Sequence, residues 1–268
     1  MEVNGRNVFI TGASSGIGRA LARAFAAQGC RLILTGRSSQ RLEETEREAA
    51  ARESLSVPAD LRDSDSIARV CEQAVTRFGG VDILVNCAGV GLYAPSFESP
   101  PDVVRQLFEL NVLAPVEITR QVLPSMPRGG AVVNISSIAG KVPLPWLTLY
   151  SASKYALNAY SDGLRMELSA AGIHVLCVCP GYVDTSFSKN VLGGRIPEKV
   201  AGQRHFKITA EKCAEEVLGG LRRDRCTVVT PRIGWLLAAA ARLIPGVIHA
   251  RMAGMRAEAE GAPTNDAQ

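Results

Sequence analysis

The stretch that decides the fold is Thr11-Gly12-Ala13-Ser14-Ser15-Gly16-Ile17-Gly18, which lies between an apolar run (7–11) and a helical pattern (16–28). A strand that passes through a glycine-rich turn into a helix is the context of a phosphate-binding turn. Gly12 permits a tight turn, Gly16 lets a pyrophosphate approach the backbone, and Gly18 lets helix and strand pack closely. Free N–H groups at the helix start favour an anion. The alternative is an ordinary glycine-rich loop.

Strands and helices alternate along the rest of the chain. Further strands are predicted at 31–35, 54–59, 82–86, 131–136, 174–179 and 226–230, and helices at 39–52, 63–78, 101–126, 150–171 and 210–223. The strands are near-continuous Val, Ile and Leu runs, which indicates burial on both faces. We therefore predict an α/β fold: a single doubly wound (Rossmann) parallel sheet of about seven strands with helices on both faces. Such a sheet binds ligands beyond the carboxyl ends of its strands.

Composition excludes several classes of protein. The 268 residues are 47% hydrophobic and 21% charged, which is typical of a globular chain. The net charge of +4 is too small to predict nucleic-acid binding. The seven cysteines form no C-x-x-C pair and the three histidines have no ligand spacing, so we expect buried thiols in a reducing compartment and no metal site. No secretory signal and no apolar run of ~18 residues is present, so we expect a cytoplasmic protein.

More motifs follow the first turn in a fixed order. They are Asp60-Leu61, Asn86-Cys87-Ala88-Gly89, Asn111, Ser137, Tyr150-x-x-x-Lys154, and Pro180-Gly181 with Thr185. Together with TGASSGIG they resemble the short-chain dehydrogenase/reductase family over about residues 5–230. Cys87 departs from this pattern, since the family's N-N-A-G motif has Asn there. We expect a local packing change at Cys87 and no loss of chemistry.

The resemblance implies a nicotinamide dinucleotide site. It assigns cofactor binding to Gly12, Ser14, Ser15, Gly16, Ile17, Gly18, Arg37, Asp60, Leu61, Asn86, Ala88, Gly89, Tyr150, Lys154, Pro180, Gly181, Val183 and Thr185. Asp60 would contact adenine, and Thr185 would reach the carboxamide. The second strand ends at Gly36, where an NAD site wants a carboxylate, and Arg37 follows. A guanidinium can bind the 2′-phosphate, so we expect NADP(H) over NAD(H). The alternative is that Arg37 is a solvated surface charge.

The resemblance assigns catalysis to Ser137, Tyr150, Lys154 and Asn111. Tyr150 and Lys154 are spaced i, i+4, which places them on one helix face. We expect the Lys154 ammonium to lower the pKa of the Tyr150 phenol, which would then exchange a proton with the substrate oxygen. Ser137 would hydrogen-bond that oxygen, with neighbouring Ser136 as a competitor. Alone, such a Tyr–Lys pair is typical of a solvated helix face.

The substrate is expected to lie under residues 186–208, a long segment without clear periodicity that we interpret as a lid. An apolar pocket is suggested by Val142, Leu144, Trp146, Leu147, Leu149 and Tyr182. The alternative is that these side chains only pack beneath the lid.

The C-terminal region carries the basic excess of the chain. Residues 222–256 contain seven Arg and one Asp. Within them 232–256 is an apolar, basic extension that Pro245-Gly246 should break into two helices. It could pack on the body or a second subunit, make peripheral contact with an anionic membrane surface, or shape the substrate entrance. Residues 257–268 are expected to be a disordered tail.

These patterns predict a catalytic domain over 1–231 that reduces a hydrophobic carbonyl (lipid-, steroid- or 3-oxoacyl-like) with NADPH, or runs the reverse alcohol oxidation. The alternatives are a catalytically silent nucleotide-binding sensor or scaffold, an NAD-dependent alcohol or polyol dehydrogenase, and an epimerase or dehydratase. The resemblance also implies a homodimer or homotetramer. We expect a small-molecule substrate and no nucleic-acid partner.

Overall fold

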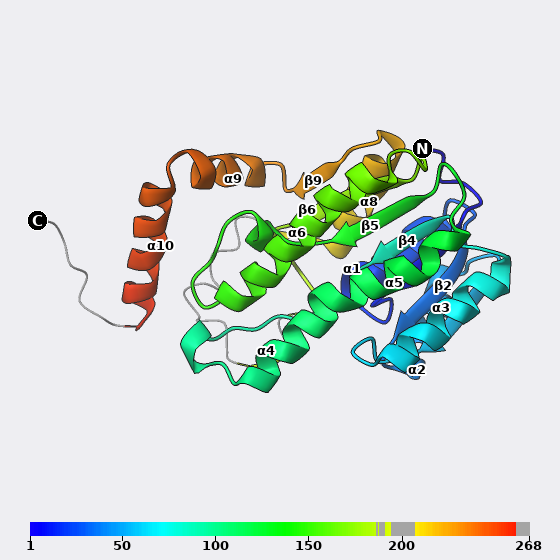
Figure 1. Cartoon of the computed structure of the whole chain (residues 1–268), viewed down its shortest axis with the longest axis horizontal. Coiled ribbons are helices and arrows are strands. Elements are labelled where there is room, and N and C mark those ends of the chain that lie inside the picture. The colour runs from blue at the N-terminus through cyan, green and yellow to red at the C-terminus, as the bar shows by residue number, and fades with distance from the viewer. Residues whose placement is uncertain (186, 188–190, 194–206, 261–268) are drawn as a thin grey trace, which may run out of the picture.

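A seven-stranded parallel sheet forms the centre of the molecule (Figure 1). The computed structural model describes residues 1–185, 187, 191–193 and 207–260, with side chains through residue 254. The strands are β1 (Asn7–Thr11), β2 (Arg31–Gly36), β3 (Ser54–Pro58), β4 (Ile83–Asn86), β5 (Ala131–Ile135), β6 (His174–Pro180) and β9 (Thr227–Thr230). Their order is β3-β2-β1-β4-β5-β6-β9, so the chain reverses its direction of winding between β1 and β4. The predicted doubly wound sheet is confirmed.

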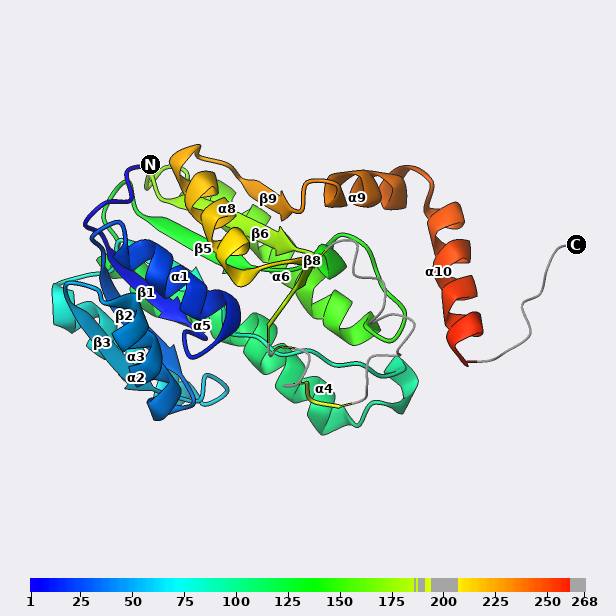
Figure 2. The same cartoon turned by 180° about the vertical axis from the view of Figure 1, so that it is seen from behind.

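Helices cover both faces of the sheet because successive residues of each strand point to opposite sides. One face carries α1 (Gly16–Ala26), α2 (Ser39–Ala49) and α8 (Ala210–Arg222). Figure 2 shows the molecule from this side. The other carries α3 (Ser64–Phe78), α5 (Ala114–Val122) and α6 (Thr148–Leu168). Along β1, for example, Val8 and Ile10 join the first core and Phe9 joins the second. The sheet is therefore fixed from both sides, and only its ends are open to a ligand.

The helix predicted over 101–126 is interrupted. It consists of α4 (Pro101–Phe108), a π-helical turn η2 (Glu109–Leu113), α5, and a 3-10 turn η3 (Leu123–Ser125). Asn111 lies in the π turn, and its side chain bonds to backbone outside the helix. Widened turns of this kind are frequent at functional sites.

Shorter elements surround the carboxyl end of the sheet. They are η1 (Ser96–Glu98), η4 (Ile138–Gly140), and the strand pair β7 (Tyr182–Val183) and β8 (Lys207–Ile208). Most of the predicted lid, 186–208, lies outside the described residues. Its described part includes an isolated bridge between Gly91 and Val191.

The C-terminal extension forms two helices that project beyond the end of the sheet (Figures 1 and 2). These are α9 (Gly234–Leu243) and α10 (Pro245–Glu260), so the predicted break at Pro245-Gly246 is confirmed. Helix α10 includes residues 257–260 of the expected tail, because Ala and Glu are good helix formers. No single described helix is long and apolar enough to span a membrane, although 234–243 and 245–254, bent by 111°, reach that length and composition together.

Candidate functional site

A cavity of about 1030 Å³ lies at the carboxyl ends of the strands. The residue after each strand of the large sheet lines it: Gly12, Arg37, Ala59, Cys87, Ser136, Gly181 and Pro231. Parallel strands end at the same edge, so one cavity collects residues that are more than 200 positions apart in the chain. This is the place predicted for the ligand, and the volume is at the upper end of the ~300–1,000 Å³ usual for such sites.

Close backbone packing shapes the glycine-rich turn. Gly12 has a φ of +66°, and a Cβ there would lie 2.8 Å from the Ala88 Cα atom. A Cβ on Gly18 would collide with the Gly12 carbonyl. Thr11 connects this turn to the end of β4, since its hydroxyl accepts bonds of 3.0 Å from the N–H groups of Cys87 and Ala88. The backbone of the Cys87-Ala88 motif is therefore held against the turn after β1.

Three charged side chains lie at the β2 and β3 end of the cavity. Arg37 and Asp60 line it as predicted, and Arg62 lines it without having been predicted. The Arg62 guanidinium donates to Asp60 Oδ1 over 3.0 Å and to Oδ2 over 2.6 Å. This pair lowers the pKa of Asp60. Because Arg62 neutralises the carboxylate, Asp60 adds little repulsion toward a phosphate near Arg37.

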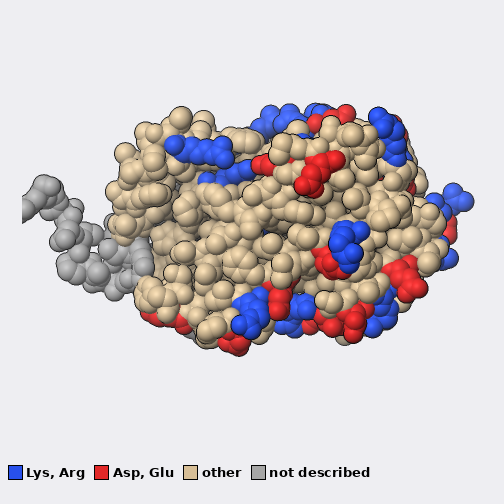
Figure 3. Space-filling view, viewed as in Figure 1, with Lys and Arg blue, Asp and Glu red and all other residues tan. Residues whose placement is uncertain are grey.

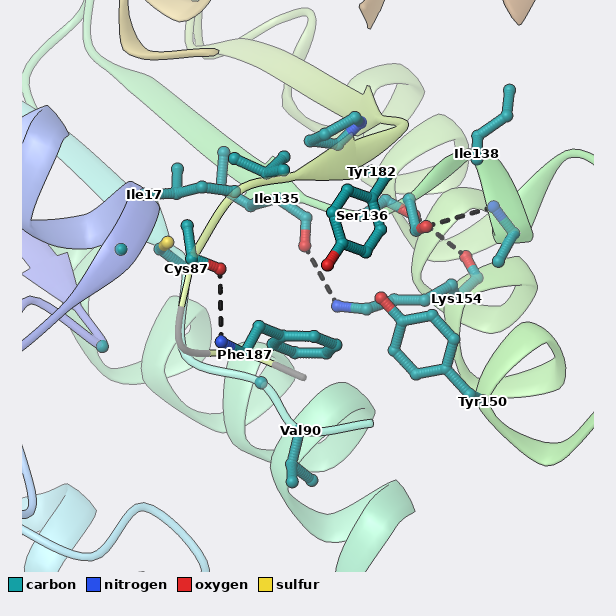
Figure 4. A pocket seen from close by; sticks show the side chains of 18 of the residues that line it. Ile17, Cys87, Val90, Ile135, Ser136, Ile138, Tyr150, Lys154, Tyr182 and Phe187 are labelled. Carbon is teal, nitrogen blue, oxygen red and sulfur yellow. Dashed lines mark hydrogen bonds between the residues drawn. The ribbon is translucent and has the colours of Figure 1, made fainter. Parts of the chain in front are cut away.

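Lys154 and Tyr150 project from α6 into the cavity (Figure 4). Lys154 is only 4% exposed, and its ammonium donates to the Ile135 carbonyl over 3.1 Å. Its Nζ lies 5.9 Å from the centre of the Tyr150 ring. Burial lowers the pKa of Lys154 to about 8, because the charged form is poorly solvated there.

We expected Lys154 to lower the pKa of the Tyr150 phenol, and this expectation is wrong. Burial raises this pKa, and a hydrogen bond with the Ser137 side chain offsets only part of the rise. Lys154 directs its ammonium to the Ile135 carbonyl, and desolvation dominates at Tyr150. A raised pKa keeps the phenol protonated at neutral pH, which is the form that can donate a proton.

Ser137 and Ser136 both line the cavity, but they have different partners. The Ser136 hydroxyl donates to the Lys154 backbone carbonyl over 3.2 Å. Ser137 starts η4, where its Oγ accepts from the Ala139 N–H over 3.1 Å, and it also bonds to Tyr150. Of the two serines, Ser137 is therefore the one whose hydroxyl contacts the Tyr150 phenol.

Asn111 and Asn86 lie behind the cavity wall. Asn111 is fully buried; its Oδ1 accepts from the Val90 N–H, and its Nδ2 donates to the Val90 carbonyl, both over 2.9 Å. The same amide donates to Ser153 over 3.1 Å. Asn86 donates to Thr119 and to Asn134, which joins β4 to α5 and β5. Both side chains hold the wall in place, and neither forms part of its surface in the described residues.

Comparisons with known proteins show the family of this chain. A model of the short chain dehydrogenase family matches residues 6–194. Dehydrogenase/reductase SDR family member 7B of Bos taurus is 37% identical over 237 residues, covering 83% of this chain and 72% of that protein. The chain belongs to the short-chain dehydrogenase/reductase family. Dehydrogenase/reductase SDR family member 7 of Homo sapiens is 34% identical, over 83% of this chain and 69% of that protein.

Solved structures of short-chain dehydrogenases show the same fold. One from Burkholderia cenocepacia J2315, in complex with NADP, has a TM-score of 0.77 and 28% identity, covering 85% of this chain and 97% of that one. Another from Burkholderia phymatum, in complex with NAD, has a TM-score of 0.78 at 23% identity, covering 100% of this chain and 99% of that one. The Rossmann-like fold of this family member is thereby established.

Most residues predicted from the family pattern lie together in the cavity. The lining includes Gly12, Ser14, Ser15, Gly16, Ile17, Gly18, Arg37, Asp60, Leu61, Ala88, Gly89, Ser137, Tyr150, Lys154, Pro180, Gly181, Val183 and Thr185. Gly16 and Thr185 meet across it, because a Cβ on Gly16 would lie 3.1 Å from the Thr185 methyl group. The turn after β1 therefore faces the loop after β6, as in a site that holds one ligand between them.

Four of the six apolar-pocket residues predicted from the sequence line the cavity of this family member. Val142, Leu144, Leu147 and Tyr182 line the cavity, whereas Trp146 and Leu149 do not. Phe187 and Leu192, from the predicted lid segment, also line the cavity. So do Val90, Leu237, Arg251, Met252 and Gly254, which had not been singled out individually. The rings of Phe187 and Tyr150 are 6.0 Å apart. The last four residues of this set come from α9 and α10, and no sequence motif marked them.

Proposed function

We propose that this protein is an NADP(H)-dependent reductase of a hydrophobic ketone or aldehyde, which can also run the reverse alcohol oxidation. The observation that carries the proposal is one cavity with the glycine-rich turn at one end and Ser137, Tyr150 and Lys154 at the other. A family member that only senses a nucleotide, without catalysis, would not need Ser137, Tyr150 and Lys154 in the same cavity. The site is also continuous, so a hydride donor and a carbonyl can meet inside it.

The residues present fit a dinucleotide. The turn after β1 offers backbone N–H groups at the start of α1; Gly12 lets this turn pack against Ala88, and Gly16 keeps a side chain out of the gap that separates the turn from Thr185. At the other end, Gly89 leaves room beside Lys154, because a Cβ there would lie 3.4 Å from Nζ. Bound there, the reduced nicotinamide would supply a hydride to the carbonyl carbon. Lys154 would hold the ribose hydroxyls nearest the reacting ring.

Arg37 supports NADP(H) over NAD(H). It follows β2 and lines the cavity, and Gly36 places no carboxylate beside it. The nearby carboxylate of Asp60 is paired with Arg62. A phosphate at this point would thus find a guanidinium that has no ion pair among the described residues, and little negative charge. The NADP complex of the Burkholderia cenocepacia relative is consistent with this preference.

The chain's own groups supply the proton. Tyr150 would donate its phenolic proton to the carbonyl oxygen, and Ser137 would hydrogen-bond the same oxygen as negative charge develops there. Lys154 would stabilise the phenolate that remains. Asn111 would act indirectly, through Val90 and Ser153, by fixing the backbone beside Lys154.

The substrate class follows from the apolar side chains of the cavity wall, several of which pack with Tyr150. Leu144, Leu147, Phe187 and Met252 are apolar, so a polyol would leave its hydroxyl groups without partners there. We infer a lipid-, steroid- or 3-oxoacyl-like carbonyl compound. We also infer a homodimer or homotetramer, consistent with the exposed Leu113 and Met166 on helices whose counterparts form subunit contacts in the family.

Turnover assays test the proposal. NADPH and NADH oxidation would be followed with long-chain aldehydes, steroid ketones, 3-oxoacyl thioesters and simple sugars. We expect turnover with NADPH and an apolar carbonyl. Tyr150→Phe should lower kcat/KM by about 10²–10⁴-fold, the usual contribution of a general acid, while NADPH binding persists. Turnover unchanged in Tyr150→Phe would contradict the proposed chemistry.

A further inference from the structure

Helix α9 is apolar on both sides. Its inner side, which includes Gly234 and Ala238, is buried, and Leu237 lines the cavity. Its outer side exposes Trp235 (46%) and Leu236 (71%), with Leu243 (80%) two turns further along. A soluble surface helix normally turns a polar face to water, whereas a helix that is apolar all round is covered by protein or lipid.

The apolar surface continues past the end of α9. Ile233 precedes the helix, and Ile244 and Val247 surround the 111° bend into α10. We call these six side chains the C-terminal apolar face: Ile233, Trp235, Leu236, Leu243, Ile244 and Val247. They are 46% to 80% exposed, and the end of the molecule that α9 and α10 form shows few charged side chains in Figure 3.

The charged residues of the segment that carries this face have one sign. Residues 232–256 contain four Arg and no Asp or Glu. Arg242 is exposed and lies seven residues, about two helical turns, after Trp235 on α9. An apolar surface bordered by arginines matches an anionic bilayer, which takes the apolar side chains between its headgroups and the guanidinium groups at its phosphates. In a symmetric contact between two copies, arginines would face arginines without a carboxylate to pair them.

We propose that the C-terminal apolar face docks on an anionic lipid surface. Trp235, Leu236 and Leu243 enter the interface, and Arg242 binds lipid phosphates. The cavity adds a consequence, because α9 and α10 also supply its lining residues Leu237, Arg251 and Met252. An apolar substrate dissolved in the bilayer therefore enters beside the docked helices. This consequence alone rests on the proposed reductase function.

Vesicle flotation of the full chain tests the docking. The vesicles contain phosphatidylcholine alone or with 30% phosphatidylglycerol, at low and high salt. We expect binding to the anionic vesicles that falls with salt and is several-fold weaker on phosphatidylcholine. Leu236→Glu with Leu243→Glu should reduce binding at least 10-fold. Phe97→Glu, at a side chain 76% exposed elsewhere, should leave it unchanged. Arg242→Glu should weaken binding, and Arg47→Glu on α2 should not.

A second measurement leaves the face intact. In Trp146→Phe, Trp235 is the remaining tryptophan of the chain. Its fluorescence should shift to the blue on anionic vesicles and be quenched by brominated lipid. Absent vesicle binding by the wild type, or unquenched Trp235, overturns the proposal. A third outcome also overturns it: the wild type does not bind vesicles, and Leu236→Glu with Leu243→Glu abolishes self-association. The C-terminal apolar face is then a contact between subunits. None of these measurements depends on turnover, so they test the docking proposal independently of the reductase proposal.

Discussion

Burial acts in opposite directions on the two central side chains of the site. It raises the pKa of Tyr150 and lowers that of Lys154, because each shift favours the neutral form of its group. The protein therefore holds a protonated phenol beside an ammonium that loses its proton unusually easily. Keeping Lys154 charged at neutral pH costs stability, which indicates that the charge is retained for function.

Lys154→Met should reveal this cost as a pH-dependent difference in stability. Between pH 8 and 10.5 the folded protein has released the Lys154 proton while the unfolded chain still binds it, so wild-type stability rises with pH there. The free energy of unfolding of the wild type, minus that of the variant, should increase by about 2–3 kcal/mol from pH 7 to pH 10. Urea unfolding at several pH values measures it.

Lys212→Met is the matched control. Lys212 is exposed, and Glu215 raises its pKa, so its pH-dependent difference should be small and of opposite sign. If the Lys154→Met difference is constant across this pH range, Lys154 ionises equally in the folded and unfolded chain, and the assignment of its burial is wrong.

At the scale of elements, two glycines within helices allow the effect of helix propensity on stability to be separated from the effect of side-chain packing. Gly163 lies in α6, and a Cβ there would meet open space. Gly220 lies in α8, and a Cβ there would lie 3.0 Å from the side chains of Leu176 and Val228. The two positions therefore offer the same gain in helix propensity but different room for a methyl group.

Gly163→Ala should raise the free energy of unfolding by about 1 kcal/mol, the propensity difference between Ala and Gly. Gly220→Ala should lower it by about 1 kcal/mol or more, because overpacking outweighs that gain. Thermal unfolding would show shifts of Tm in opposite directions, while Gly163→Ala leaves cofactor binding unchanged. Shifts of the same sign would show that propensity, and not the contact with the sheet, decides at Gly220.

Elements were predictable where the physical signal is local. The seven strands follow from buried Val, Ile and Leu runs, and the turn after β1 from its glycines. The π turn at Asn111 was not predictable, because its cause is a bond to Val90, 21 positions away. The pairing of Arg62 with Asp60 also escaped notice, since two neighbouring opposite charges on a loop are usually solvated. The sequence predicted two C-terminal helices and left open whether they shape the substrate entrance, but it did not indicate which residues of α10 would line the cavity.

At the scale of the whole molecule, the cavity joins segments from both halves of the sheet. Its walls come from the ends of β1 to β6 and β9, and from α9 and α10. A ligand that occupies its length binds only when these segments are assembled, so it should stabilise the fold as a unit. The nucleotide preference can therefore be read from stability without knowing the substrate.

NADPH should raise Tm more than NADH does at equal concentration. A ligand at 100 times its Kd contributes ~2.7 kcal/mol, which for a chain of this size corresponds to roughly 5–10 °C. Arg37→Ala should reduce the NADPH shift to that of NADH, because only NADPH carries the 2′-phosphate that Arg37 would bind. Arg47→Ala, on the exposed side of α2, should keep the difference. Equal shifts in the wild type, or a larger one with NADH, would assign the site to NAD(H) and leave Arg37 as a solvated charge.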